Sequence, residues 1–281
     1  CNSIRYCGAT PVFVDVDLKT LGLSAESLQS FLDEYCEIRD DGFCWNKISN
    51  RVVRACLPMH TFGMPAKLDA IKLVCDRYNI VLVEDAAESL GSTYNQQHTG
   101  TFGKLAAISF NGNKIITTGG GGMLLTNSEN LARQAKHITT TAKINHKWAF
   151  EHNEIGFNYR LPNINAALGL AQLECLPSFV DKKRELANIY QDWGSKNGIN
   201  FVTETGDSRS NYWLNAVITN NVTERNDFLE YTNKNLVMTR PAWTPMHNLS
   251  INSDCQTVKL ENTEWLFNRI VNVPSSVVLN D

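Results

Sequence analysis

The sequence predicts an α/β protein in which a mostly parallel mixed sheet lies between helices, with a smaller α+β domain towards the C-terminus. Short apolar runs alternate with segments whose apolar residues recur at helical spacing, a pattern typical of βαβ units. The chain of 281 residues is long enough for one large and one small domain. We therefore expect a large domain at residues 1–194 and a small domain at residues 195–281.

The first third of the chain is expected to form a βαβαβ unit. Residues 11–17 form the first expected strand, and Ser24 then opens a helix with apolar residues at helical spacing. A second strand is expected at 52–58, followed by a helix that begins at Pro65 and a third strand at 80–84. Helices that connect successive strands in this way imply a sheet of mostly parallel strands.

The rest of the chain continues the alternation and ends in a mixed region. The expected elements are a strand at 122–126, a helix capped by Ser128, a small-residue helix that Pro177 interrupts, a helix at 178–193, a strand at 212–219, and helices near 223–234 and 261–270. The helix after Ser128 is expected to bury Leu131, Ala132, Ala135 and Ile138. The polar segment 139–160 has no clear periodicity, and loops of that length are usually functional or mobile, so it is a candidate lid.

Composition and charge exclude several classes of function. The net charge is −3 and the sequence has no basic tract, which argues against a nucleic-acid partner and against electrostatic membrane binding. The eight cysteines form no CxxC pair and show no metal-ligand spacing with histidine, so we expect ordinary thiols in a reducing cytoplasm and no metal site. No apolar run approaches the roughly 20 residues that a membrane span requires.

The stretch from Val83 to Met123 gathers the residues that point to chemistry. Asp85 ends an apolar run, and the carboxyl ends of strands are where open α/β sheets bind ligands. Ser109 closes a second expected strand, and Lys114 follows it after a polar turn. A lysine that is partly desolvated there becomes an amine nucleophile towards carbonyls. Four glycines then allow close backbone approach and positive φ angles.

Each of these features has an ordinary explanation by itself. A lone lysine after a strand is usually a solvated surface residue, a strand-end acid is often a turn former, and a glycine run can be a flexible turn. Their occurrence together favours a pyridoxal 5'-phosphate (PLP) site. Such a site needs a lysine that binds the cofactor covalently, an acid that pairs with its pyridine nitrogen, and a hydroxyl that binds its phosphate.

The same residues stand in a series of longer motifs. These are GATPVFVDVD at 8–17, LPMHTFGMPAKLDAI at 57–71, VEDAAESLGS at 83–92, TGTFGKLAAISFNGNKIITTGGGGM at 99–123, and GFNYRLPNINAALGLAQLE at 156–174. In content and order they resemble the DegT–StrS group of sugar aminotransferases, which are fold-type I PLP-dependent transferases. The residues of these motifs most resemble those of the family branch that aminates nucleotide-linked 4-keto-6-deoxy-HexNAc sugars in bacillosamine and legionaminic acid synthesis.

The resemblance assigns roles to individual residues. It implies that Lys114 and Asp85 are catalytic and bind PLP, that Ser109 binds the cofactor's phosphate, and that Glu88 contacts the cofactor where many relatives have Gln or His. It implies that Asn158 crosses a homodimer interface to the partner's cofactor phosphate, and that Arg160 faces the substrate. Read without the resemblance, Arg160 is more often a surface salt-bridge former. A relative with histidine in place of this lysine performs dehydration, so Lys114 favours transamination.

Two histidines are further candidates for substrate binding. His60 follows the strand expected at 52–58 and is placed near the same sheet edge as Asp85, although a packing role is equally consistent with its position. His247 and the nearby Trp243 lie in the turn TRPAWTPMH and are candidates for a substrate cleft, although packing is the more frequent role for such residues.

The resemblance implies a PLP-dependent transamination from an amino-acid donor, glutamate, to C4 of a nucleotide-linked 4-keto sugar. It also implies a segment ahead of residue 8, with a loop that grips the cofactor's phosphate and an aromatic residue that stacks on its ring. Neither is in this sequence, so we expect a fragment or a truncated reading frame. The alternative hypothesis is therefore a catalytically silent homologue or fragment that does not bind PLP stably.

Overall fold

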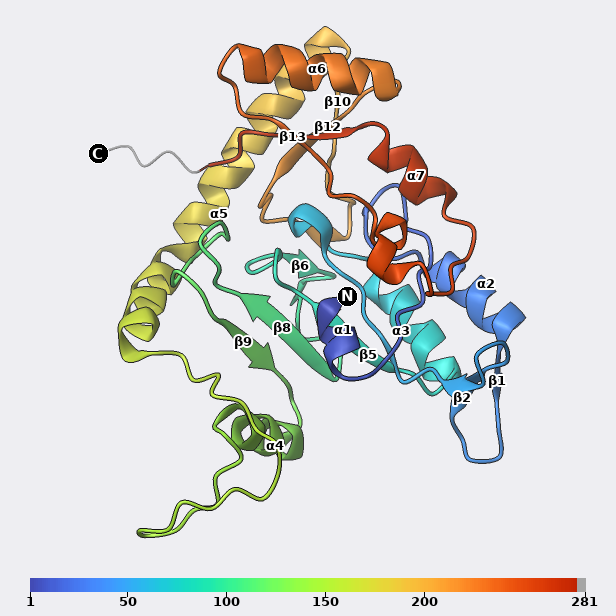
Figure 1. Ribbon diagram of the computed structural model, residues 1–281. Helices are drawn as coiled ribbons and strands as arrows, with labels where there is room; N and C mark the ends of the chain where they lie inside the picture. Colours follow the sequence, from blue (N-terminus) through green and yellow to red (C-terminus); the bar gives the residue numbers. More distant parts are fainter. Residues whose placement is uncertain (277–281) are drawn as a thin grey trace.

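A mixed four-stranded sheet forms the centre of the computed structural model, which describes residues 1–276 (Figure 1). Its strands are β4 (Ala55–Cys56), β5 (Val81–Asp85), β8 (Leu105–Ser109) and β9 (Gly122–Leu125), in the order β4-β5-β8-β9. β5 is parallel to both β4 and β8, whereas β9 is antiparallel to β8. The predicted mostly parallel mixed sheet is thus confirmed.

Two helices cover one face of this sheet and enclose the main hydrophobic core. Ser24 caps α2 (Ala25–Tyr35) by accepting a hydrogen bond from the backbone N–H of Ser27, as the sequence predicted. α3 (Leu68–Arg77) begins later than the predicted start at Pro65. Buried apolar side chains of both helices pack against those of β4 and β5, so this core joins the two helices to the sheet.

The N-terminal segment differs from the prediction of a strand at 11–17. Only isolated bridges are present, from Phe13 to Thr257 and from Val16 to Leu23. The reason lies in Asp15, whose buried carboxylate turns towards α7 (Glu261–Phe267) and accepts hydrogen bonds from the backbone N–H groups of Asn262 and Thr263. The segment therefore joins the two ends of the described chain instead of extending the sheet.

The long helix α5 (Asn163–Asn197) replaces the two helices that the sequence predicted. Pro177 lies inside it, so the predicted interruption is wrong. α4 (Glu129–Thr139) is capped by Ser128 as predicted, but it has no buried residue, and the expected inward-facing side chains are only partly covered or exposed. The segment between α4 and α5 runs away from the sheet, held by antiparallel bridges such as Thr140 to Asn158 (Figure 1).

A second four-stranded sheet, entirely antiparallel, lies at the other end of α5 (Figure 1). Its strands are β10 (Asn200–Phe201), β12 (Asn215–Ile218), β14 (Ile270–Val273) and β13 (Arg240–Pro241), in that order. α6 (Val222–Lys234) packs on it through Phe228 and Leu229. The domain boundary at residues 194 and 195 stays a prediction, because α5 passes it without a break.

The remaining elements are short. They are α1 (Asn2–Tyr6), β1 (Cys36–Ile38), β2 (Cys44–Asn46), β3 (Arg51–Val52), β6 (Thr93–Tyr94), β7 (Gln97–His98), β11 (Ser208–Arg209), and the 3-10 turns η1 (Thr61–Gly63), η2 (Met246–Asn248) and η3 (Ser250–Asn252). Among residues 1–276 no helix is both long and apolar enough to cross a membrane.

Candidate active site

Lys114 and Glu88 meet where β5 and β8 end. Glu88 lies in the turn after β5, Lys114 lies in the turn after β8, and 3.6 Å separate Nζ of the lysine from Oε1 of the glutamate. Only 13% of the lysine side chain and 10% of the glutamate side chain remain exposed. The pair is thus held in surroundings where charges are weakly screened.

The other oxygen of Glu88 is held by the backbone of η1. Oε2 accepts a hydrogen bond of 2.8 Å from the N–H of Phe62, whose φ of 59° lies in the left-handed region that bulky residues rarely adopt. Burial raises the pKa of the Glu88 carboxyl, and the nearby charge of Asp85 raises it further, against the opposing effects of Phe62 N–H and Lys114. Glu88 therefore holds a proton more readily than an exposed glutamate.

Asp85 is the last residue of β5, on the opposite face of the strand from the fully buried Glu84. Its side chain is half-buried, and Oδ1 accepts a hydrogen bond of 3.1 Å from the N–H of Ala87. Because its charge acts on Glu88, which in turn contacts Lys114, the structure brings these three predicted residues together.

Ser109 ends β8 at the same edge of the sheet, and its Oγ accepts a hydrogen bond of 3.2 Å from the N–H of Asn111. Among residues 1–276 no acceptor is found for its own hydroxyl proton, which leaves a donor for an anion. One glycine of the run that follows is required by the sheet. A Cβ on Gly122 would lie 2.4 Å from the carbonyl oxygen of Ile108, so the close pairing of β9 with β8 requires glycine there.

Trp213 completes the site and was not among the predicted residues. Its buried indole lies under Lys114, with Nζ 4.0 Å from the ring centroid, and Nε1 donates a hydrogen bond of 2.7 Å to the carbonyl of Asn113. Trp243 stacks nearly parallel to it, with centroids 6.4 Å apart, and is 61% exposed. Lys114 thus lies between the carboxyl of Glu88 and the ring of Trp213, and Trp243 extends the aromatic surface to the solvent.

His60 follows β4 as expected, and its backbone N–H donates a hydrogen bond of 3.2 Å to the carbonyl of Asp85, but its ring turns into the protein. Its fully buried ring accepts a hydrogen bond from the N–H of Ala66 at Nδ1, which leaves the proton on Nε2 for Glu84, 3.2 Å away. Both ring nitrogens are therefore occupied inside the protein. This geometry leaves neither ring nitrogen of His60 free for a substrate and does not support the predicted substrate-binding role.

The partner of His60 is itself a feature that the sequence reasoning missed. Glu84 accepts hydrogen bonds from the backbone N–H groups of Gly100, Phe102 and Gly103, at 2.7, 2.7 and 2.6 Å. Burial by itself would raise the pKa of this carboxyl, but the hydrogen bonds from His60 and the loop outweigh burial and lower it. The sequence did offer a signal for a buried, hydrogen-bonded carboxylate, because Glu84 is a charged residue within an apolar strand.

Asn158 and Arg160 lie together but apart from the lysine. Both are exposed in the segment between α4 and α5, where Nε of Arg160 donates a hydrogen bond of 3.0 Å to Oδ1 of Asn158. His247, in η2, lies 2.8 Å from Glu264 and is likewise not brought to Lys114 by any contact within residues 1–276. The roles predicted for these three residues stay predictions.

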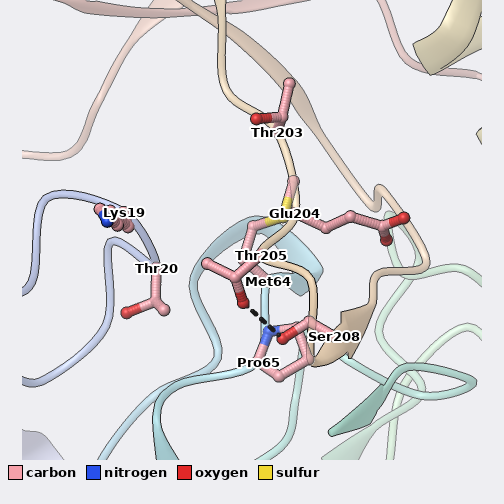
Figure 2. Close-up of a pocket in the computed structure, with 8 residues that line it drawn as sticks. All are labelled: Lys19, Thr20, Met64, Pro65, Thr203, Glu204, Thr205 and Ser208. Carbon is pink, nitrogen blue, oxygen red and sulfur yellow. Dashed lines mark hydrogen bonds between the residues drawn. The ribbon is translucent and has the colours of Figure 1, made fainter.

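A small pocket elsewhere on the chain contains none of the predicted site residues. It lies between the turn at 17–22 and the segment after β10 (Figure 2). Its lining residues are Lys19, Thr20, Met64, Pro65, Thr203, Glu204, Thr205 and Ser208. The hydroxyls of Thr205 and Ser208 are hydrogen-bonded to each other at 3.0 Å, as Figure 2 shows. This pocket is therefore separate from the lysine site.

Comparison with known proteins decides the family. The sequence model of the DegT/DnrJ/EryC1/StrS aminotransferase family matches residues 1–281. The chain belongs to this family. It is 36% identical over 98% of its length to EpsN of Bacillus subtilis, whose name describes a pyridoxal phosphate-dependent aminotransferase, and it covers 69% of that protein. It is 35% identical, again over 98% of its length, to the GDP-perosamine synthase of Escherichia coli O157:H7, of which it covers 70%.

Solved structures agree on the fold. A DegT DnrJ EryC1 StrS aminotransferase from Brucella abortus superposes with a TM-score of 0.88 at 24% identity, covering 100% of this chain and 72% of that one. The predicted fold-type I architecture is thereby confirmed. As a member of the family the chain is a PLP-dependent sugar aminotransferase.

The residues at the lysine site fit this cofactor. A largely enclosed amine, a strand-end carboxylate and a hydroxyl with an unused proton are the groups that a pyridine aldehyde with a phosphate requires. The four side chains Lys114, Asp85, Ser109 and Glu88 all lie at the ends of β5 and β8 or in the turns that follow them. We therefore expect them to hold PLP.

Proposed function

We propose that this aminotransferase moves an amino group from glutamate to C4 of a nucleotide-linked 4-keto-6-deoxy-HexNAc sugar. Its product would serve bacillosamine- or legionaminic acid-type surface glycans, and the reaction takes place in the cytoplasm. The observation that carries the proposal is the enclosed pair of Lys114 and Glu88 beside Asp85. The similarity to GDP-perosamine synthases supports a nucleotide-linked sugar as the acceptor.

The proposed division of labour follows from the contacts of each side chain. Lys114 would bind the cofactor and, when released, carry a proton as its general base and acid. Asp85 would hold the ring nitrogen and Ser109 the phosphate. Bound PLP supplies an electron sink for the carbon that loses its proton.

Glu88 is proposed to act as the proton reservoir of Lys114. Its raised pKa and its distance of 3.6 Å from the lysine allow it to keep a proton that the amine gives up. The N–H of Phe62 fixes one carboxyl oxygen, so the other stays directed at the lysine. Trp213 and Trp243 exclude water from one side and present apolar surface to a sugar ring.

We also propose a homodimer in which each site uses residues of both subunits. Large apolar side chains are exposed on β9, on the segment after α4 and on the first turns of α5. They include Met123, Leu124, Trp148, Phe150, Ile155, Tyr159, Ile164 and Leu170. Exposed apolar surface of this extent is typical of protein interfaces, and Asn158 and Arg160 lie within it.

A mixing experiment tests this shared site. Lys114→Ala and Asn158→Ala should each be inactive, but an equal mixture that is allowed to exchange subunits should regain about a quarter of wild-type activity, because half of the dimers then carry one intact site of two. A mixture that stays inactive although mass spectrometry shows hybrid dimers would contradict the shared site.

A product assay tests the reaction itself. The protein is incubated with PLP, glutamate and either UDP- or GDP-linked 4-keto-6-deoxy-GlcNAc, and mass spectrometry looks for the amino sugar and for 2-oxoglutarate. We expect both products with the wild-type chain and neither with Lys114→Ala. A wild-type chain that binds no PLP would instead favour the silent homologue.

A further inference from the structure

Lys183 is a buried cation that the proposed reaction does not use. It lies on the inner face of α5, 6% exposed, next to the buried residues Val180 and Ala187. Its ammonium donates hydrogen bonds to two backbone carbonyls, 3.0 Å to Trp213 and 2.6 Å to Ser275. Within residues 1–276 no carboxylate forms an ion pair with it, and burial lowers its pKa to about 8.

A lysine in this place is costly for the fold. Burying an ammonium without an opposite charge is unfavourable, and an apolar side chain of similar length would fill the same space without that cost. The neighbouring Arg184 shows the more usual arrangement, since it forms a two-pronged pair with Glu204 at 2.7 and 2.8 Å. What distinguishes Lys183 is therefore the pair of carbonyls that it holds.

One of those carbonyls belongs to the residue under the proposed catalytic amine. The backbone N–H of Trp213 is bound by Oδ1 of Asn211 at 2.8 Å, and its indole N–H is bound by the carbonyl of Asn113 at 2.7 Å. Lys183 binds the third polar group of the same residue, its carbonyl oxygen. With all three groups held, the indole has a fixed position below the amine of Lys114.

We propose that Lys183 is a positioning residue that fixes the main chain of Trp213 and, through it, the indole beneath the amine of Lys114. The proposal rests on the proposed role of Lys114. In the proposed reaction the amine of Lys114 moves between cofactor and substrate during each turnover. A rigid Trp213 indole beside it limits the positions that the amine can reach. If the indole loses its fixed position the amine is misplaced, and misplacement of a reacting group by about 1 Å can lower kcat by roughly a hundredfold.

The test compares Lys183→Met with Lys196→Met, which makes the same change at an exposed position of the same helix. We expect Lys183→Met to lower kcat by roughly ten- to a hundredfold with little change in KM. It should also shift the visible absorbance of bound PLP and make the Trp213 fluorescence more accessible to acrylamide in the cofactor-free protein. The Trp213→Phe variant identifies that part of the fluorescence. Lys196→Met should leave all of these unchanged.

A cycle with Trp213→Phe separates positioning from general destabilisation. If Lys183 acts through Trp213, adding Lys183→Met to Trp213→Phe should lower kcat by less than about twofold more. An equal loss in both backgrounds, or a folded Lys183→Met with normal kcat and fluorescence, would overturn the proposal. Should Lys183→Met not fold, Lys183→Leu takes its place: it also lacks a donor for the Trp213 carbonyl, so normal kcat and fluorescence in that variant would overturn the proposal equally.

The absorbance and fluorescence measurements need no sugar. They decide the role of Lys183 even when the wild-type protein fails to aminate the sugars offered, and such a failure would count only against the proposed substrate.

Discussion

The carboxylate of Glu88 lies 3.6 Å from the ammonium of Lys114, and both side chains are almost closed to solvent. The two residues are 26 positions apart and come from different turns, so the contact exists only because β5 and β8 are neighbours in the sheet. A carboxyl that is buried beside an amine is a proton acceptor of adjustable strength, because small changes in nearby charge shift its pKa.

Replacing Lys114 tests the centre of the proposed site. Lys114→Ala should remove the visible absorbance of bound PLP and lower kcat by at least about a thousandfold, since tether and proton carrier are lost together. Absorbance spectra before and after borohydride treatment measure this. Lys104→Ala, at an exposed position, is the control. An absorbance that survives in Lys114→Ala and bleaches with borohydride would place the tether elsewhere.

Replacing Glu88 tests the proton reservoir. Glu88→Gln keeps an oxygen for the Phe62 N–H but cannot hold the proton, so kcat should fall by about ten- to a hundredfold while PLP still binds. The comparison is steady-state kinetics with PLP binding measured by absorbance. Normal kcat in the glutamine variant would mean that Lys114 exchanges protons with another group.

The same variant predicts a pH effect on stability. The pKa of Glu88 is raised by folding, so its ionisation opposes the fold; this penalty is absent below the pKa of the unfolded chain and complete above that of the folded chain. Cofactor-free Glu88→Gln should therefore gain stability relative to wild type as the pH rises above the ordinary glutamate pKa of about 4.3. Urea unfolding at a series of pH values measures the free energy of unfolding of both proteins, and a variant that loses stability relative to wild type as the pH rises would contradict the prediction.

For Glu84 we predict the opposite dependence of stability on pH. Its pKa is lowered by folding, so its contribution is present above the unfolded pKa and is lost as the pH falls through the folded pKa. Glu84→Gln turns an amide towards several N–H groups and should lower the free energy of unfolding by about 2–4 kcal/mol at neutral pH, and by less in acid. Urea unfolding with Glu230→Gln, at an exposed position, as control checks this. Equal loss at every pH would exclude the charge as its cause.

Two glycines of the same run should respond differently to alanine. Gly122→Ala places a Cβ against the carbonyl of Ile108 and should cost about 1–3 kcal/mol of stability. A Cβ on Gly120 would have no other atom within 4 Å, so Gly120→Ala should change stability little. Thermal unfolding of the two variants measures this, and equal effects would mean that the β8–β9 contact is looser than described.

Local signals in the sequence predicted local structure well. Ser24 and Ser128 mark two helix starts because a cap is a hydrogen bond between near neighbours in the chain. The mixed sheet was predictable because strand and helix patterns alternate along the chain. The proximity of Asp85, Glu88 and Lys114 was predictable because the carboxyl ends of neighbouring parallel strands meet at one edge of a sheet. The break predicted at Pro177 was wrong: α5 continues through this residue, although proline removes one backbone hydrogen bond from the helix.

Contacts between distant residues were not predictable in this way. Trp213 reaches Asn113 across 100 positions, and no spacing in the sequence indicates that. His60 was placed at the correct edge, but outside a regular strand the alternation of side chains does not say whether a ring turns inward. The helix after Ser128 shows the periodicity of an amphipathic helix, yet within the described chain nothing buries its apolar side.

Asp15 has a consequence for how the chain reaches its native state. Its hydrogen bonds to Asn262 and Thr263 span 247 and 248 positions, and Phe13 pairs with Thr257 beside them. Contacts of such separation form late, because the entropy of closing the intervening loop must be overcome first. During synthesis the carboxylate of Asp15 therefore lacks these partners until residues 257–263 have been translated.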